Sequence, residues 1–451
     1  MTLLKKSSVL LLTALLAACS DSDESSGTGY VQMYNASSNS PNVYLEIDDV
    51  IRTGAGFGQV TTRHNYNNDD YELNYLYIND NDDYISLLED NDTLSIKSDV
   101  KHLKVLAGDY NEPQIKQFEI AEFDEDDKFQ LAAINTVSDD KEYDIYLAKD
   151  DYDFVDAELI STTNYLGLSE LNELTEDNYT FYVTLKDDSN VIFQSNMVDF
   201  DDEQTYIVMI RPSFSAQPGG ITLDIVSDAS SVTSLTHVDA KSQIRFYNAI
   251  DEYSNVSFNA SSTKDEITTE LVNNDVATDY HSVNAGTFML SMLDSSNNLI
   301  VSNYVEAVNK NVSLLSIFYQ HSAGYPAMIS VAENLTPNEV SHQVQVVNLI
   351  DTSPFDTELN EIDIYFTEGT ETIEDTTSYI KSIDAFETKS VYLDSQSYDV
   401  TITYQANNQT ISILQLADMD FSEKGNYILI LEEDEKQTDG YKVTLLNTLA
   451  Q

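Results

Sequence analysis

The chain has 451 residues and is strongly acidic, since 78 Asp and Glu stand against 22 Lys and Arg and the formal net charge is −56. Such a surface repels phosphate backbones, so the composition excludes nucleic acid as a partner. Hydrophobic residues make up 41% of the chain, which favours a folded protein with an acidic surface over a disordered one. Two explanations of the charge stay open: adaptation to salty surroundings and loading with divalent cations.

Residues 1–18 predict a bacterial lipoprotein signal peptide. Lys5 and Lys6 precede an apolar run at residues 9–16, which is too short to be a permanent membrane span. Small residues then lead to Cys19, the sole cysteine of the chain. This junction is similar to the lipobox of bacterial lipoproteins, and the resemblance implies that Cys19 is acylated and becomes the new N-terminus. The alternative is an ordinary secretory signal that contains a cysteine.

The residues after Cys19 predict how the protein is attached. Ser20 follows the cysteine, whereas lipoproteins kept in the inner membrane usually have Asp there, so the resemblance implies a lipid anchor in the outer membrane. Residues 19–28 are rich in Ser and acid and are expected to form a flexible tether. The sequence does not decide between the periplasmic and the surface face.

One segment, an alternating strand that ends in Asn, recurs four times. The four residues are Asn35, Asn135, Asn248 and Asn348, at separations of 100, 113 and 100 positions. This pitch suits a small β-sandwich and exceeds a solenoid repeat. We therefore predict an all-β chain, an array of four antiparallel immunoglobulin-like β-sandwich domains. Their predicted bounds are 29–127 (repeat 1), 128–240 (repeat 2), 241–340 (repeat 3) and 341–451 (repeat 4).

Each repeated Asn is predicted to be structural. The residues two and four positions before it are apolar in all four copies, so the strand period places the Asn on the inward face at the strand end. There its amide is expected to bond backbone groups of the following loop. A ligand-binding role for the four Asn is the alternative.

The other strand signals follow the same order in every repeat. An aromatic residue opens a strand after a polar turn, at Tyr71, Tyr179, Phe288 and Tyr398. An apolar run and a last alternating strand come next, and six or seven short strands per repeat are expected. The junction at residues 227–242 is rich in Ser, Thr and Ala, so it is expected to bend most freely.

This order resembles an uncharacterised repeat domain, a domain of unknown function, of bacterial envelope lipoproteins. That domain has a strand ending in Asn or His, then Ala-Ser-Pro and a second strand. The first copy fits best, with Asn35-Ala36-Ser37 followed by Pro41, whereas copies two and three lack a nearby Pro. The resemblance implies a sandwich in an anchored envelope protein and brings no catalytic residues.

The sequence shows no catalytic motif. The six His are scattered, with no His-Glu-x-x-His pair and no second Cys, so zinc has no evident ligand set. We therefore predict no enzyme and no cofactor. The acidic loop clusters are interpreted first as solvated charge that discourages aggregation of edge strands. The alternative is calcium, which takes hard oxygen ligands, and the loop acids Asp124, Asp126 and Asp127 are its candidate site.

The sequence thus favours a non-catalytic, lipid-anchored cell-envelope protein that presents a four-domain binding or spacer array. One alternative is a periplasmic or surface lipoprotein that binds a ligand, with a glycan or an envelope protein as its partner. The other is an enzyme with an unrecognised site. A binding copy should hold clustered polar or aromatic residues that the equivalent loops of its siblings lack.

Overall fold

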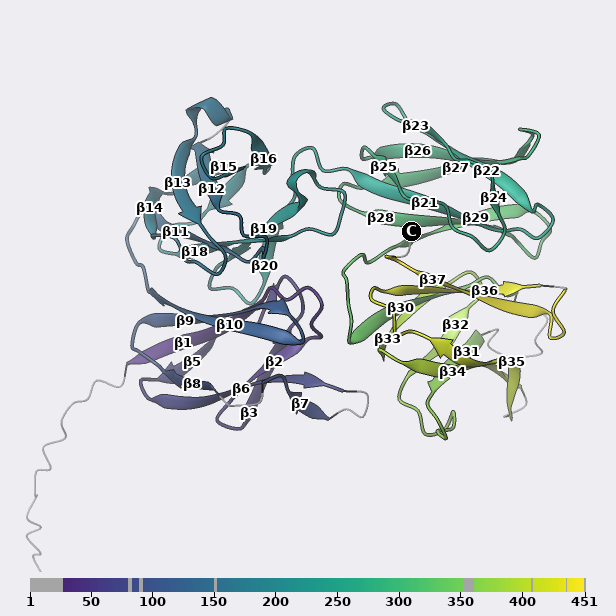
Figure 1. The fold of residues 1–451 in the computed structure, drawn as a ribbon, viewed down its shortest axis with the longest axis horizontal. Helices are drawn as coiled ribbons and strands as arrows, with labels where there is room; N and C mark the ends of the chain where they lie inside the picture. The colour runs from purple at the N-terminus through teal and green to yellow at the C-terminus, as the bar shows by residue number, and fades with distance from the viewer. Residues whose placement is uncertain are drawn as a thin grey trace, which may run out of the picture.

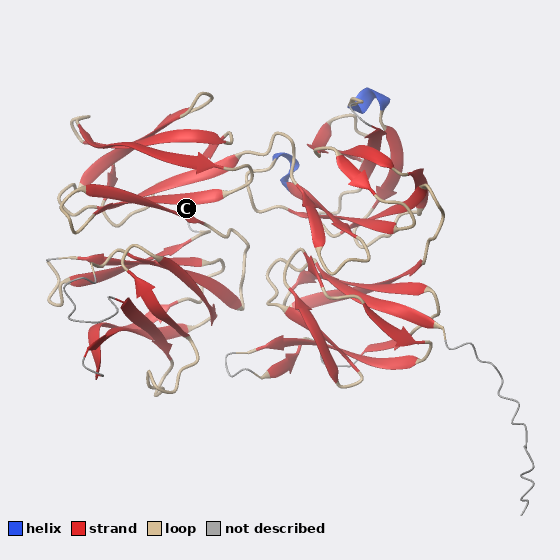
Figure 2. Cartoon of the chain, turned by 180° about the vertical axis from the view of Figure 1, so that it is seen from behind, coloured by secondary structure: helices blue, strands red, loops and turns tan. Residues whose placement is uncertain are grey.

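The structure is a computed structural model that describes residues 27–79, 83–88, 92–149, 152–351, 361–406, 409–434 and 436–449. The predicted signal peptide, Cys19 and most of the tether lie outside these residues. The described chain consists of β-strands in eight sheets, with two short 3-10 turns at Phe154–Asp156 and Pro218–Gly220 (Figure 2). The predicted all-β sandwich architecture is confirmed. None of the helical turns in the described ranges could traverse a lipid bilayer.

Repeats 1 and 2 each place two sheets around a core of their own. The strands of repeat 1 are β1 (Thr28–Asn35), β2 (Val43–Ile47), β3 (Val50–Ala55), β4 (Gln59–Val60), β5 (His64–Asn67), β6 (Asp70–Ile78), β7 (Tyr84–Ser86), β8 (Asp92–Ser95), β9 (Val100–Asp109) and β10 (Glu112–Ala121). Those of repeat 2 are β11 (Lys128–Asn135), β12 (Tyr143–Lys149), β13 (Glu158–Thr163), β14 (Asn172–Thr175), β15 (Asp177–Leu185), β16 (Val191–Gln194), β17 (Val198–Phe200), β18 (Thr205–Pro212), β19 (Ile221–Val226) and β20 (Val232–Leu235).

Repeats 3 and 4 are built in the same way. The strands of repeat 3 are β21 (Ser242–Ala249), β22 (Asn255–Ser261), β23 (Glu266–Thr268), β24 (Val272–Asn273), β25 (His281–Val283), β26 (Gly286–Asp294), β27 (Leu299–Val308), β28 (Ser313–Gln320) and β29 (Pro326–Ala332). Those of repeat 4 are β30 (Ser341–Asn348), β31 (Glu361–Thr367), β32 (Tyr379–Asp384), β33 (Thr388–Asp394), β34 (Ser397–Ala406), β35 (Gln409–Asp420), β36 (Tyr427–Glu433) and β37 (Tyr441–Asn447).

The first strand of each repeat makes one parallel pair, which corrects the expectation of purely antiparallel sheets. The parallel pairs are β1 with β9, β11 with β18, β21 with β28 and β30 with β36. A tight hairpin cannot join parallel neighbours, so the chain between them crosses over and builds the second sheet. Each repeat also has more strands than the six or seven expected, because short edge strands such as β4 and β24 carry too few residues to show a period.

The junction at residues 227–242 is not the freely bending linker that its composition predicts. Part of it forms β20, which extends the sheet of repeat 2 by pairing with β19. Asp228 in the same segment forms ion pairs with Arg63 and with Lys101, both in repeat 1, the latter at 3.3 Å. The junction is therefore held against repeat 1 by hydrogen bonds and charge.

The first sheets of repeats 1 and 2 pack face to face, as do those of repeats 3 and 4. In the first strand, Val31 and Met33 point into the core of repeat 1, while Tyr34 belongs to the cluster between the repeats. That cluster joins Tyr34, Leu103 and Val105 to Ala132, Ile134 and Ile207. Its counterpart joins Tyr247, Leu315 and Ile317 to Val347, Ile428 and Ile430. Each pair is thus a stack of four sheets, the left and right columns of Figure 1.

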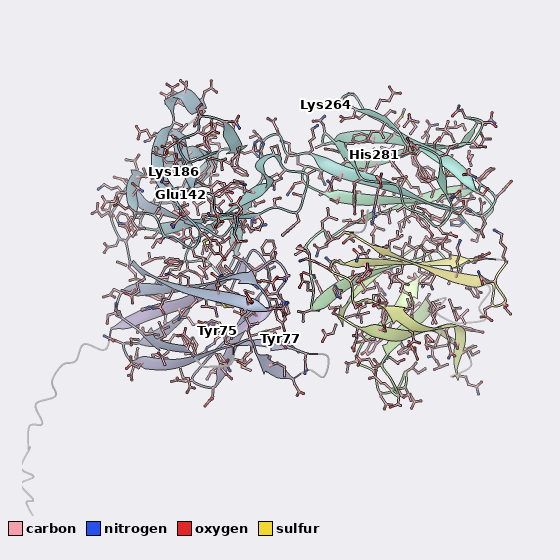
Figure 3. All side chains as sticks on the ribbon, viewed as in Figure 1. Tyr75, Tyr77, Glu142, Lys186, Lys264 and His281 are labelled. Carbon is pink, nitrogen blue, oxygen red and sulfur yellow. The ribbon has the colours of Figure 1, made fainter. Side chains whose placement is uncertain are left out.

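Side chains fill the space between the sheets throughout both stacks (Figure 3). Tyr75 on β6, labelled there, is buried in repeat 1 and donates a hydrogen bond of 3.1 Å to Asp92. The buried ammonium of Lys104 contacts the same carboxylate at 2.5 Å. Because a buried charge must be paired, Asp92 holds Lys104 in an otherwise apolar core.

The two pairs are related as copies of one two-repeat unit. Asn35 and Asn248 are 213 positions apart, and so are Asn135 and Asn348. Repeats 1 and 3 have Tyr immediately before the Asn, whereas repeats 2 and 4 have Ile or Val there. Equal spacing and alternating residue type indicate that a two-repeat unit was duplicated.

Candidate functional site: a cleft between repeats 3 and 4

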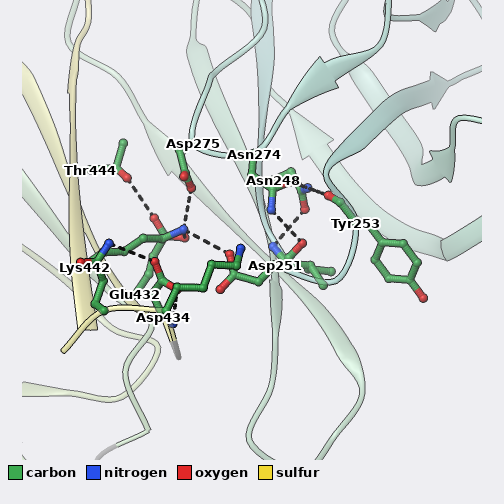
Figure 4. Close-up of polar contacts among 12 residues, drawn as sticks. Asn248, Asp251, Tyr253, Asn274, Asp275, Glu432, Asp434, Lys442 and Thr444 are labelled. Atoms are coloured by element: carbon green, nitrogen blue, oxygen red, sulfur yellow. Dashed lines mark hydrogen bonds and ion pairs between the residues drawn. The ribbon is translucent and has the colours of Figure 1, made fainter. Parts of the chain in front are cut away.

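All four repeated Asn side chains are buried and make the same local contacts. Each Oδ1 accepts a hydrogen bond, 2.8 to 3.0 Å long, from the backbone N–H two positions on, at Ser37, Val137, Ile250 and Ile350. Each Nδ2 donates to a backbone carbonyl of a loop or strand end, that of Ala55, Lys141, Tyr253 or Asp384. The Asn248 contacts appear in Figure 4. The amides are therefore occupied by the chain's own backbone, as in an Asx turn.

The structure does not gather Asp124, Asp126 and Asp127 into one ligand set. In the described part of the chain, the acids that converge are Asp127, Glu176 and Asp202, whose carboxylate oxygens lie within 4.8 Å of one another. The charge of Asp202 is the main cause that raises the pKa of Glu176. Calcium takes about six to eight oxygens. Three solvent-facing carboxylates supply fewer, so the cluster fits solvated charge better than a built calcium site.

A buried polar network crosses the interface of repeats 1 and 2. The Tyr34 hydroxyl donates a hydrogen bond of 2.7 Å to Asp224, which also forms an ion pair of 2.5 Å with Arg211. Burial, and next the charge of Asp224, raise the pKa of Tyr34, so the hydroxyl remains a neutral donor. Gly58 lies against this network with a φ of +73°, and a Cβ there would come within 3.0 Å of Arg211 Nε. Glycine therefore leaves room for the buried pair.

The matching network between repeats 3 and 4 has more acid than base. The Tyr247 hydroxyl donates a hydrogen bond of 2.6 Å to Glu432. The Lys442 ammonium lies 2.6 Å from Asp275, 3.4 Å from Asp251 and 3.5 Å from Glu432 (Figure 4). One cation thus serves three carboxylates at this interface.

Glu432 is the most perturbed acid of this network. Its side chain is buried, and this burial raises its pKa to about 7, against the opposing effects of the Tyr247 hydrogen bond and the Lys442 charge. Its Oε2 accepts no hydrogen bond from any described residue, although Lys442 lies 3.5 Å away. A buried oxygen without a donor is costly unless something else satisfies it.

A cavity of about 350 Å³ opens beside Glu432 between repeats 3 and 4. Its acidic lining comes from the loops after β21 and β30 and from the end of β36. The carboxylates that line it are Asp251, Glu252, Asp351, Glu432 and Glu433. The cleft is therefore strongly negative.

An aromatic column built from both repeats supplies another part of the lining. Tyr319 stacks on Phe386 with ring centres 5.0 Å apart, and Phe386 stacks on His321 at 4.6 Å. Tyr325 continues the column on the far side of His321, at 4.7 Å. Phe386 comes from the turn between β32 and β33 of repeat 4, and the other three rings come from repeat 3. Stacking of the rings across the boundary fixes the shape of the cleft.

The aromatic column is absent from repeats 1 and 2 at the equivalent positions. The backbone N–H of Phe386 bonds the carbonyl of Asn348, and that of Leu166 bonds the carbonyl of Asn135, each at 2.7 Å. Both residues have positive φ, 64° for Phe386 and 52° for Leu166, so the backbone is shared and the side chain differs. By the strand register, the replacements are Ala107 for Tyr319, Asp109 for His321 and Leu166 for Phe386. This is the asymmetry expected of a binding copy.

The cleft offers binding groups and no evident catalytic pair among its described side chains. Ser322 Oγ lies 3.4 Å from His321 Nδ1, a long contact, and the same nitrogen accepts the backbone N–H of Ala323 at 3.1 Å. His321 is thus not placed to activate Ser322.

Comparisons with known proteins add little. No family model matches the chain, and no curated protein matches it. Among solved structures it is similar to the TIE protein of Bacillus anthracis, at 9% identity and a TM-score of 0.16, over 90% of this chain and 68% of that one. It is also similar to a candidate cell adhesion protein of Bacteroides fragilis, at 9% identity and a TM-score of 0.13, over 45% of this chain and 86% of that one. Scores this low carry no inference about function.

Proposed function

We propose that this chain is a non-catalytic, lipid-anchored protein of the bacterial cell envelope that binds its ligand in the cleft between repeats 3 and 4. The aromatic column carries the proposal, because it is built on a backbone that repeats 1 and 2 share without the aromatic side chains. A conserved framework with a locally different lining is what specialisation of one copy for binding produces.

Anchoring through Cys19 in the outer membrane completes the proposal and rests on the lipobox-like junction. The arrangement of the repeats suits an anchor at the N-terminal end of repeat 1. The described chain enters at Thr28 in repeat 1, whereas the cleft lies in the other column of Figure 1. The lipid would hold repeat 1 near the membrane and leave repeats 3 and 4 to meet the ligand.

A ligand screen with matched variants tests the proposed function. The full mature chain in detergent is screened by thermal unfolding against small organic ions and envelope glycan fragments, alongside Phe386→Leu, which installs the residue of repeat 2. Leu166→Phe is the reciprocal control. A ligand of the cleft should raise the midpoint of wild type and of Leu166→Phe, because free ligand stabilises the state it binds, and should raise that of Phe386→Leu less. Ligands that stabilise all three chains equally would place the binding site elsewhere and overturn the proposal.

A further inference from the structure

We propose that the cleft between repeats 3 and 4 binds a primary ammonium on an aliphatic stem, the chemistry of a diamine or of a lysine side chain. This inference rests on the proposed function and adds the ligand class.

The negative charge of the cleft favours a cationic ligand. Five carboxylates line the cavity, and the nearby cation Lys442 contacts two of them, Asp251 at 3.4 Å and Glu432 at 3.5 Å, besides Asp275. An electronegative cavity with low-dielectric walls concentrates cations. A neutral ligand such as a sugar would leave the excess of acid over base in this lining unchanged.

The spacing of the carboxylates disfavours a bare metal ion. Across the described residues, the one group of three or more acidic, His or Cys side chains whose ligand atoms converge within 4.8 Å is Asp127, Glu176 and Asp202, at the junction of repeats 1 and 2. The cleft acids are therefore too dispersed to surround a compact ion. An ammonium needs fewer contacts, because it carries three donors that separate acceptors can share.

The aromatic part of the lining favours a ligand whose cationic group is carried on an apolar stem. Tyr319, Phe386 and His321 line the same cavity as the carboxylates, and because their faces are stacked on one another they offer mainly apolar ring edges, which can pack against methylene groups. A volume of about 350 Å³ lies at the small end of ligand sites. It suits a short chain with a charged tip.

Glu432 is positioned to respond to that charged tip. The residue lines the cleft, and its buried Oε2 accepts no hydrogen bond from the described residues and lies 3.5 Å from the Lys442 ammonium. The positive charge of an ammonium in the cleft would favour the ionised form of this carboxylate. The groups that face Glu432 are Tyr247 and Asp275 of repeat 3 and Lys442 and Thr444 of β37. Because the pKa of Glu432 lies at about 7, cation binding should release a proton and tighten as pH rises through neutrality.

The test is calorimetric titration of the full mature chain in detergent at about 150 mM NaCl, which screens diffuse attraction to the acidic surface. The probes are cadaverine, a capped Gly-Lys-Gly tripeptide, and pentanediol as the neutral analogue of cadaverine. Two charge-matched variants are compared. The cleft variant combines Glu252→Gln with Glu432→Gln, and the junction variant combines Asp127→Asn with Asp202→Asn where repeats 1 and 2 meet.

We expect saturable binding of an amine and none of pentanediol. The cleft variant and Phe386→Leu should each weaken amine binding by about tenfold or more, a loss of about 1.4 kcal/mol, while the junction variant binds like wild type. Amine binding should also be tighter at about pH 8 than at about pH 6. Binding of cadaverine but not of the tripeptide identifies the ligand as a free diamine. Binding of the tripeptide but not of cadaverine identifies it as a lysine side chain of a partner protein. Either result supports the proposal.

Equal weakening by the two charge-matched variants would show unspecific attraction and overturn the ammonium assignment. So would binding of neither amine. Binding of pentanediol that Phe386→Leu abolishes would also overturn the ligand class, yet it would leave the cleft as the binding site. The proposed function fails separately, by the ligand screen above.

Discussion

The Tyr34 hydroxyl of repeat 1 lies 2.7 Å from the Asp224 carboxylate of repeat 2 and donates a hydrogen bond to it across a buried interface. Tyr247 and Glu432 form the corresponding contact between repeats 3 and 4 at 2.6 Å. In each pair, a Tyr next to the repeated Asn contacts an acid of the neighbouring repeat. These contacts tie the repeats into pairs.

Replacing Tyr34 by Phe should lower the free energy of unfolding by about 1 to 3 kcal/mol, because Asp224 loses a buried donor while the packing is kept. Chemical denaturation of the full chain measures it. Tyr152→Phe is the control, since Tyr152 is 59% exposed. Equal stability of the two variants would contradict the role of the hydroxyl.

The repeated Asn side chains should contribute a similar amount to the free energy of unfolding. Asn248→Ala leaves the backbone N–H of Ile250 and the carbonyl of Tyr253 without their partner, so we expect a loss of about 1 to 3 kcal/mol in unfolding free energy. The exposed Asn190, changed to Ala, serves as the matched control. An unchanged denaturation midpoint for Asn248→Ala would count against the structural role.

Glu432 should make stability depend on pH. Its pKa is about 7 in the folded chain and 4.5 as a free side chain, so the folded state holds the proton more tightly. This contribution is fully present below about pH 4.5 and is lost as pH rises through about 7, to a total of about 3 kcal/mol. Glu432→Gln should flatten this part of the stability curve, measured by denaturation at stepped pH, while the exposed neighbour variant Glu433→Gln should keep it. Parallel curves for wild type and Glu432→Gln would refute the assignment.

Cys19 is predicted to carry the anchor. Cys19→Ala should move the protein from the outer-membrane fraction to the soluble fraction, because lipid chains are the proposed source of membrane affinity. Cell fractionation with immunoblotting shows the outcome, and Ser20→Ala is the neighbouring control. A Cys19→Ala protein that stays in the membrane pellet would place the anchor elsewhere.

The acid cluster of Asp127, Glu176 and Asp202, at the junction of repeats 1 and 2, should respond to ionic strength and not to calcium in particular. Thermal midpoints in calcium, magnesium and sodium chloride at matched ionic strength should agree, because screening reduces repulsion whatever the ion. A rise specific to calcium that disappears on changing Asp127 and Asp202 to Asn would instead establish a calcium site at these residues.

The amino-acid sequence by itself determined the strands and the turn at each repeated Asn. Alternation in a strand is a local signal, so Val31 and Met33 could be placed on the inward face and Asn35 at the strand end. The sequence also carried the alternation of Tyr and aliphatic residues before the Asn, which distinguishes odd from even repeats. The short edge strands could not be predicted from the sequence, since strands of two to four residues show no period.

Only the tertiary structure decided which repeats pair, which acids meet and where the cleft lies. Tyr34 and Asp224 are 190 positions apart, and Tyr319 and Phe386 are 67 apart, so no local pattern links either pair. Asp127 meets Glu176 and Asp202 rather than its sequence neighbours because loops from distant strands converge at one end of the sandwich. Such contacts depend on how whole sheets stack. The alternation within a strand specifies the face that points into the core of its own repeat. The stacking of sheets then buries the other face against the neighbouring repeat.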